Sequence, residues 1–217
     1  MCRFLLLHAQ ETDAVHQVAQ AFAQMCQHST GPEGSAQGDG WGVAWRHDDG
    51  QWRLHRSVAP IWTETQVLQQ LPLTRHVVVH ARRASFARHQ GEVLYNQPYL
   101  WENYAFVFNG FVKGVKLRQP VPGTIGAEKI WYLVRQQLQR GAAPADALER
   151  VYTLLSRHSR ELRACNMGLH NGQELVVYNG NPSATPYYDL HHVYQTGLRM
   201  IGSEPFGHWA WQRPAGS

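Results

Sequence analysis

The chain has 217 residues, of which 43% are hydrophobic and 17% are charged. This composition is typical of a globular protein that buries most of its chain surface, and it excludes an intrinsically disordered protein. A formal charge of +4 invites a nucleic-acid partner, but the 20 basic residues are scattered along the sequence among acidic and apolar ones. We therefore expect ordinary solvated faces and no nucleic-acid binding.

Targeting segments and cysteine pairs are both missing from the sequence pattern. No apolar run approaches the roughly 18 residues that a membrane span requires, and the apolar stretch within residues 1–8 is too short for a signal peptide. Three cysteines, Cys2, Cys26 and Cys165, have no paired spacing. The sequence thus predicts a cytoplasmic protein without a membrane anchor, a disulfide framework or a zinc site of the CxxC kind.

Apolar periodicity and turn residues divide the chain into strands and helices. The first half is predicted to hold a strand at 2–9, a helix at 12–27, a Gly-rich loop at 29–40, strands at 41–46 and 52–58, a short helix at 64–71 and a strand at 76–82. The second half is predicted to hold a strand at 104–108, helices at 128–138 and 144–156, and strand pairs at 166–170 with 174–178 and at 192–196 with 199–202. Helices between runs of antiparallel strands predict one layered α+β domain over residues 1–217.

Cys2 stands out because it follows the initiator Met1. Removal of the methionine is generally permitted before a residue as small as cysteine, and it would leave a thiol and a free α-amine on one residue. An α-amine has a pKa of about 7.7–8.0, so it can accept the thiol proton and later protonate a leaving amine. The alternative is a small buried residue at the start of a strand, and position alone favours that alternative.

Two further segments carry groups that suit acyl transfer. The strand predicted to end at Asn109-Gly110 could aim an amide and a backbone N–H at one oxygen, as an oxyanion hole requires; alone, the pair reads as a plain turn. A buried strand also leads into Arg82, Arg83 and Ser85, where a guanidinium and a hydroxyl could bind a carboxylate. The alternatives for the arginines are a structural ion pair or simple exposure to solvent.

These segments together resemble one family, the class II glutamine amidotransferases among the N-terminal-nucleophile hydrolases, and above all its stand-alone γ-glutamyl amidohydrolases. Each matching piece is short, but their order, with cysteine at position two, is specific. The pieces are residues 1–5 (MCRFL), 38–45 (GDGWGVAW), 80–85 (HARRAS), 96–99 (NQPY), 108–110 (FNG) and 203–205 (SEP).

The resemblance implies a four-layer αββα sandwich of two mainly antiparallel sheets covered by helices. It implies that Cys2 is the nucleophile, that Asn109 and Gly110 form the oxyanion hole, and that Arg82 with Ser85 holds the substrate α-carboxylate. The implied reaction is hydrolysis of the side-chain amide of glutamine or of a γ-glutamyl conjugate, with no cofactor. A glutaminase subunit that supplies ammonia to a partner synthase chain, a homologue that binds a metabolite without turnover, and a homodimer all stay open.

Two positions depart from the family pattern. The family's acid that receives the substrate α-ammonium has its counterpart at Gly126, and Gln97 stands where a histidine is common. A glycine cannot pair a cation, so the substrate preference is open. Of the 13 histidines, the adjacent His191 and His192 would point to opposite faces of a strand, while His8 and His80, both at strand ends, could lie near each other without a further ligand. We therefore predict no metal site.

Overall fold

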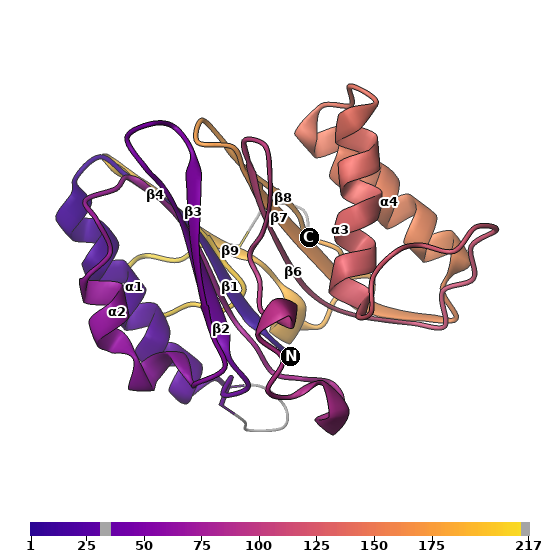
Figure 1. Ribbon diagram of the computed structural model, residues 1–217, viewed down its shortest axis with the longest axis horizontal. Coiled ribbons are helices and arrows are strands. Elements are labelled where there is room, and N and C mark those ends of the chain that lie inside the picture. Colours follow the sequence, from indigo (N-terminus) through magenta and orange to yellow (C-terminus); the bar gives the residue numbers. More distant parts are fainter. Residues whose placement is uncertain (31–35, 214–217) are drawn as a thin grey trace.

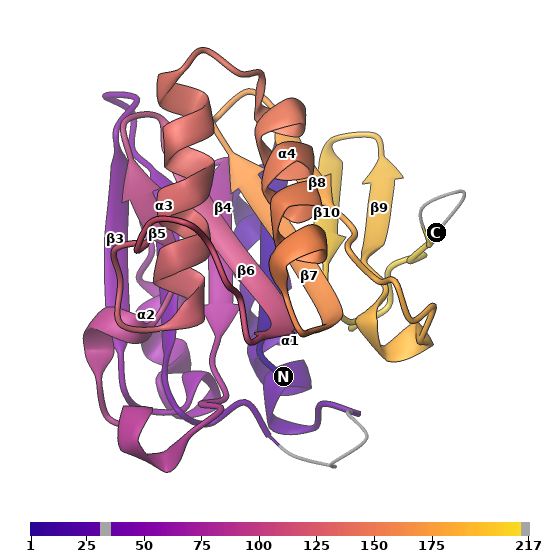
Figure 2. The same ribbon diagram turned by 90° about the vertical axis from the view of Figure 1, so that its right-hand side faces the viewer.

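The computed structural model describes residues 1–30 and 36–213, and it is a sandwich of two antiparallel sheets (Figure 1). The first sheet has six strands in the order β3-β2-β4-β1-β10-β9, and the second has four in the order β5-β6-β7-β8. Helices α1 and α2 cover the outer side of the first sheet, and α3 and α4 lie across β6 and β7 of the second (Figures 1 and 2). The expected four-layer αββα architecture is confirmed.

The first sheet and its cover comprise β1 (Arg3–Ala9), α1 (Thr12–Gln27), β2 (Trp41–Arg46), β3 (Trp52–Ser57), α2 (Thr65–Gln69), β4 (His76–Ala81), β9 (His191–Gln195) and β10 (Leu198–Gly202). The second sheet and its cover comprise β5 (Tyr99–Trp101), β6 (Tyr104–Lys113), α3 (Gly126–Gln139), α4 (Pro144–His158), β7 (Glu161–His170) and β8 (Leu175–Tyr178). Within the described residues, no helix is long and apolar enough to cross a membrane.

Side chains alternate between the two faces of each strand, and this alternation forms three apolar layers. Odd-numbered residues of β1 and β4 pack under α1, and even-numbered residues of β6 pack under α3. The remaining positions, among them Phe4, Leu6, Val78 and Val107, meet between the sheets. Strands β1, β4 and β6 all contribute to this inter-sheet layer; Cys2 directly precedes β1, Arg82 directly follows β4, and Asn109 lies within β6.

One strand boundary differs from the sequence prediction in a way that bears on the site. The strand predicted to end at Asn109-Gly110 continues as β6 to Lys113, with Asn109 opposite Asn166 and Gly110 opposite Cys165 in β7. The turn signal of an Asn-Gly pair is overridden because β7 begins at Glu161, five residues earlier than predicted, and supplies a partner strand. The predicted loop at 29–40 lies partly outside the described residues.

Three histidines lie at one end of the inter-sheet layer, away from the start of β1. The rings of His8 and His76 stack with centroids 4.6 Å apart, and the facing ring nitrogens of His76 and His170 are 3.3 Å apart. His8 pairs with His76 in the register of β1 and β4, while His80 pairs with Phe4 near the opposite end. The expectation that His8 and His80 could lie near each other is therefore wrong.

Buried histidines make the stability of the fold depend on pH. Burial, reinforced by the charge of Arg82, lowers the pKa of His80 to about 3, and burial next to His76 lowers that of His170 to about 3. An unfolded histidine titrates near 6.5, so below this pH the unfolded chain binds protons that the folded chain rejects. The free energy of unfolding is then fully present above pH 6.5 and falls as the pH drops towards 3. From pH 7.5 to pH 5 we expect a loss of about 4 kcal/mol from the two residues, measured by urea unfolding.

The control isolates the share of His170, because burial also lowers the pKa of His76, to about 4. A His170→Phe protein should lose about 2 kcal/mol of the pH dependence, whereas a His158→Phe change on the exposed end of α4 should leave it intact. Equal pH dependence in the wild type and in His170→Phe would contradict the assignment.

Candidate functional site

A polar end closes the inter-sheet layer where β1 begins. Continuing the strand alternation, Cys2 and Arg82 point from the first sheet to the same side as Phe4 and Val78. Asn109 points from β6 to the same side as Val107, towards them. The N-terminus lies at this end of the sandwich (Figure 1). The structure thus brings the candidate nucleophile, carboxylate binder and oxyanion donor to one end of one layer.

Cys2 is half-buried and lies against the backbone that follows β4. The Arg83 N–H donates to the Cys2 sulfur over 3.4 Å, and the thiol lies 3.5 Å from the Arg83 carbonyl oxygen. The α-amine of Met1 donates to the Tyr187 hydroxyl at 3.1 Å. Cys2 is a free cysteine, as are Cys26 and Cys165, which are fully buried.

The residue after Cys2 anchors the start of β1. Arg3 is buried and forms an ion pair with Glu204, and its guanidinium also donates to the Ser29 hydroxyl at 3.1 Å. Burial alone would raise the pKa of Glu204, but Arg3 and hydrogen bonds from Thr30 and Ser29 more than offset this and hold the pKa below its ordinary value. The buried ion pair fixes the backbone next to Cys2. It also explains the glutamate in the segment at 203–205, because Glu204 is the partner of Arg3.

Arg82 is 5% exposed, and its guanidinium is only partly paired by the described residues. Its Nη2 donates to the His89 carbonyl at 2.7 Å, and its guanidinium lies over the Tyr95 ring. Its Nη1 is buried and has no hydrogen-bond partner within the described part of the chain. A buried cationic donor left unpaired is a place where an anion would bind.

The Gly-rich segment at 38–42 braces the same end. Asp39 accepts the Ala84 N–H at 2.8 Å, and the backbones of Asp39 and Gly40 bond to that of Arg82. Gly40 has a φ of +108°, and a Cβ there would lie 2.3 Å from the Asn96 amide, so only glycine fits. Trp41 is fully buried in the core under α1.

Asn109 is 2% exposed and lies opposite Asn166 in the ladder of β6 and β7. The amide of Asn166 donates to the Tyr188 carbonyl at 2.6 Å. The side-chain oxygens of both asparagines are buried without a partner among residues 1–30 and 36–213. Asn166 was not singled out from the sequence, although strand alternation from Gly168 would have placed it on this face.

The backbone N–H of Gly110 points to an open edge of β6. In an antiparallel strand, successive residues direct their backbone groups to alternate neighbours. Phe106 pairs with Tyr99 of β5, so Phe108 and Gly110 face the same edge, but β5 begins at Tyr99 and does not extend to Gly110. A Cβ at Gly110 would lie 2.4 Å from the Ala164 carbonyl oxygen, which explains the glycine.

The other two predicted substrate-binding residues, Arg83 and Ser85, relate to this group in different ways. Arg83 meets Cys2 through its backbone. Ser85 is exposed in the loop after β4, and its hydroxyl bonds to neither Arg82 nor Cys2 within the described residues. The predicted pairing of Ser85 with Arg82 is therefore not formed within the described residues.

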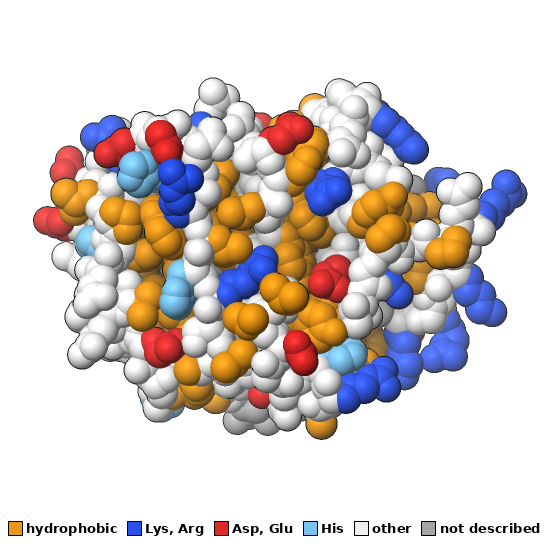
Figure 3. Space-filling model, in the orientation of Figure 1, with side chains coloured by type: hydrophobic (Ala, Val, Ile, Leu, Met, Phe, Trp, Pro, Cys, Tyr) orange, Lys and Arg blue, Asp and Glu red, His pale blue; other side chains and the backbone are white. Residues whose placement is uncertain are grey.

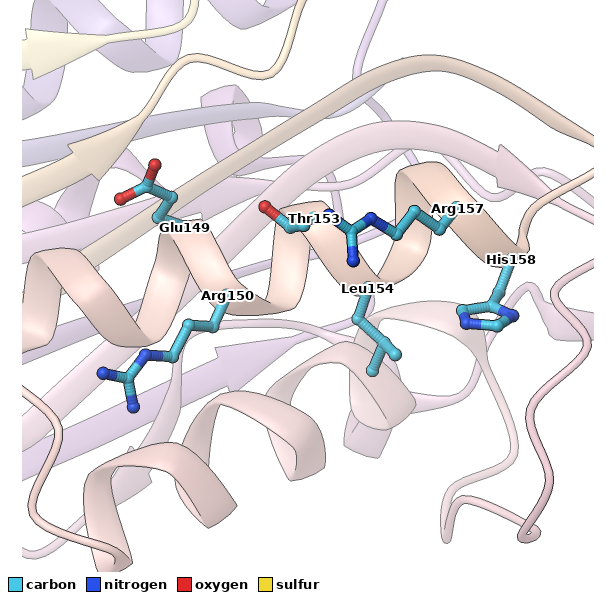
Figure 4. A pocket seen from close by; sticks show the side chains of 6 residues that line it. All are labelled: Glu149, Arg150, Thr153, Leu154, Arg157 and His158. Carbon is cyan, nitrogen blue, oxygen red and sulfur yellow. The ribbon is translucent and has the colours of Figure 1, made fainter.

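Basic residues gather on a different face. The segments 113–118 and 157–163, far apart in sequence, are joined by bonds from the Lys116 N–H to the His158 carbonyl (2.9 Å) and from the Arg160 N–H to the Lys113 carbonyl (3.1 Å). Lys and Arg side chains collect at the edge of the molecule where α4 lies (Figure 3). A shallow hollow on α4 contains none of the candidate site residues; it is lined by Glu149, Arg150, Thr153, Leu154, Arg157 and His158 (Figure 4). Nor do the described residues contain a group of side chains able to hold a metal ion.

Comparison with known proteins points to one family. A family profile described as "Glutamine amidotransferases class-II" matches residues 1–207. A glutamine aminotransferase class-II domain protein from Silicibacter pomeroyi has a TM-score of 0.61 at 16% identity and covers 98% of this chain and 90% of its own. The glutamine phosphoribosylpyrophosphate amidotransferase from B. subtilis has a TM-score of 0.59 at 15% identity, and the match covers 94% of this chain but 42% of that one. No curated protein sequence matches significantly.

Proposed function

The chain belongs to the class II glutamine amidotransferase family, and we propose that it is a γ-glutamyl amidohydrolase with Cys2 as its nucleophile. Family membership supports hydrolysis of a glutamine-type amide in general. The observation that carries the proposal is the meeting of Cys2, Arg82 and the open edge at Asn109-Gly110 at one end of the inter-sheet layer. Three unpaired thiols also suit a reducing compartment such as the cytoplasm.

In the proposed reaction, removal of Met1 frees the α-amine of Cys2. This amine takes the thiol proton, and the sulfur attacks the side-chain carbonyl carbon of the substrate. The Asn109 amide and the Gly110 N–H stabilise the negative oxygen that forms. The departing ammonia or amine takes the proton, and water then cleaves the thioester to release glutamate, or N-acylglutamate from an acylated substrate, and to restore the thiol. The nucleophile, the base and the oxyanion donors all belong to the protein, and water is the second substrate.

The free Nη1 of Arg82 supports a carboxylate clamp for the substrate. A buried guanidinium holds a carboxylate through charge-assisted hydrogen bonds. Ser85 is exposed in the adjoining loop and could add its hydroxyl only once a substrate lies there. We propose the same for the side chain of Arg83, whose backbone already contacts Cys2.

The substrate preference follows from what surrounds Gly126. Gly126 is the first residue of α3, and a Cβ built on it would meet nothing within 4 Å. The nearby carboxylate of Glu128 accepts the backbone N–H groups of Thr124 and Ile125 through one oxygen and caps the helix. Gly126 offers no carboxylate to a substrate ammonium, and Glu128 is engaged in the helix cap, so we propose a γ-glutamyl substrate whose α-nitrogen is acylated or otherwise uncharged.

The test compares kcat/KM for glutamine and for N-acetylglutamine. A free ammonium desolvated without a partner is costly, so the wild type should favour the acylated substrate by on the order of 10-fold or more. Gly126→Asp, for which the structure leaves room, should reverse this preference. Gly126→Asn adds an uncharged side chain of the same shape as Asp and should not reverse it. A wild type that strongly prefers free glutamine would contradict the substrate proposal.

The same assay separates the two alternatives. A homologue that only binds a metabolite would turn over neither substrate. A glutaminase subunit would use free glutamine and accelerate when a partner synthase is added. The match covers only 42% of the B. subtilis amidotransferase, which therefore has much additional chain. This supports a glutaminase subunit with a partner synthase as an alternative.

A further inference from the structure

We propose that Gln97 is a positioning residue that holds the oxyanion strand against the nucleophile's sheet. This inference rests on the proposed function, because the strand concerned carries Asn109 and Gly110. Gln97 is 3% exposed. Its side-chain Nε2 donates to the Phe108 carbonyl at 3.1 Å, and its Oε1 accepts the Phe108 N–H at 2.6 Å. One side chain thus satisfies both backbone groups of the residue that precedes Asn109.

The contact completes the sheet at the point where β5 is missing. The register of β5 and β6 runs from Trp101 opposite Tyr104 to Tyr99 opposite Phe106. Two residues further along, a strand would place its backbone opposite Phe108, but the Gln97 side-chain amide takes that place. The amide therefore fixes the last paired position of this edge, and it leaves the following N–H on the same edge, that of Gly110, unpaired by β5.

The backbone around Gln97 is tied to the other sheet. The Asn96 amide donates to the Ser57 carbonyl at the end of β3 over 2.7 Å, and Arg56 donates to the Pro98 carbonyl over 2.7 Å. The Gln97 carbonyl oxygen lies so close to Gly42 of β2 that a Cβ there would be 2.4 Å away. Gln97 therefore links the sheet that holds Cys2 to the strand that holds the oxyanion donors.

The consequence is specific to the transition state. The oxyanion donors must meet an oxygen that forms only after attack, so a small shift of β6 should lower kcat and leave substrate binding nearly unchanged. In Gln97→Met, an apolar side chain of similar length leaves the Phe108 peptide unpaired. We expect kcat to fall about 10²-fold, with KM changed less than about threefold. Alkylation of Cys2 by iodoacetamide, which needs no oxyanion donor, should proceed at the wild-type rate.

Two controls distinguish a positioning role of Gln97 in catalysis from a role in stability alone. Gln136→Met removes an Nε2 bond of the same length, 3.1 Å to the Tyr132 hydroxyl on α3, and should leave kcat unchanged. In an Asn109→Ala background, Gln97→Met should cost much less than in the wild type, because its effect runs through the same donors. Fully multiplicative losses, an unchanged kcat, or a rise in KM alone would overturn the inference.

Hydrogen exchange keeps this inference separable from the proposed function. The Phe108 amide should exchange at least about tenfold faster in Gln97→Met, while the amides of Leu5 to Leu7 in β1 stay protected. Faster exchange at Phe108 in a protein that hydrolyses no glutamine-type amide would refute the proposed function and leave the positioning contact standing. Unchanged exchange at Phe108 would refute the positioning role itself.

Discussion

The Cys2→Ala protein is expected to fold normally and to lose turnover of every substrate by about 10⁴-fold or more. Cys2 supplies the attacking sulfur, and after removal of Met1 it would also supply the base. Its Sγ contacts only the Arg83 backbone among the side-chain hydrogen bonds of the described residues, so its loss should disturb little packing. The measurement is ammonia release from N-acetylglutamine, with the unfolding transition recorded on the same sample.

The other two cysteines are the matched controls. Burial raises the pKa of Cys165 to about 12 and that of Cys26 well above its ordinary value, so neither thiol forms a thiolate readily. Cys26→Ala and Cys165→Ala should therefore keep kcat near the wild-type value in the folded protein. Loss of activity in folded Cys165→Ala together with retention in Cys2→Ala would contradict the assignment.

Asn109→Ala should lower kcat by about 10²–10³-fold, the effect of losing one oxyanion donor, with little change in KM. Arg82→Lys should act in the opposite way. It keeps the charge but loses the planar fork that binds a carboxylate, so KM should rise more than kcat falls. Steady-state kinetics with N-acetylglutamine measures both parameters.

Asn103→Ala, in the exposed turn between β5 and β6, is the control for Asn109→Ala and should leave both parameters unchanged. Equal effects of Asn109→Ala and Arg82→Lys on kcat and on KM would show that the two residues do not divide chemistry from binding.

Much of the fold follows from local patterns in the sequence. The predicted bounds of α1 and β2 are those of the structure, and β1 and β4 differ by one residue at an end, because buried strands and amphipathic helices repeat at fixed periods. β5 was missed because three residues are too few to show a period. The true end of β6 depends on its ladder with β7, which no local signal contains.

In the candidate site, too, some features follow from local sequence and others depend on tertiary contacts. Residue type and order predict Cys2, Arg82 and Asn109, and strand alternation directs all three into the layer between the sheets. Three features depend on contacts between distant segments: the ion pair of Arg3 with Glu204, the Gln97 amide on Phe108 and the free edge at Gly110. These contacts arise from tertiary packing, so a reading of local patterns could not supply them.

The most direct test of Cys2 as an N-terminal nucleophile is the mass of the active protein, measured before and after alkylation. Purified from a normal cytosol and treated with limiting iodoacetamide, the protein should lack one methionine residue and carry one adduct. Peptide mapping should locate the adduct on an N-terminal Cys2, and activity should fall in step with labelling. A fully active protein that keeps Met1, or inactivation that tracks a label on Cys26 or Cys165, would contradict the account.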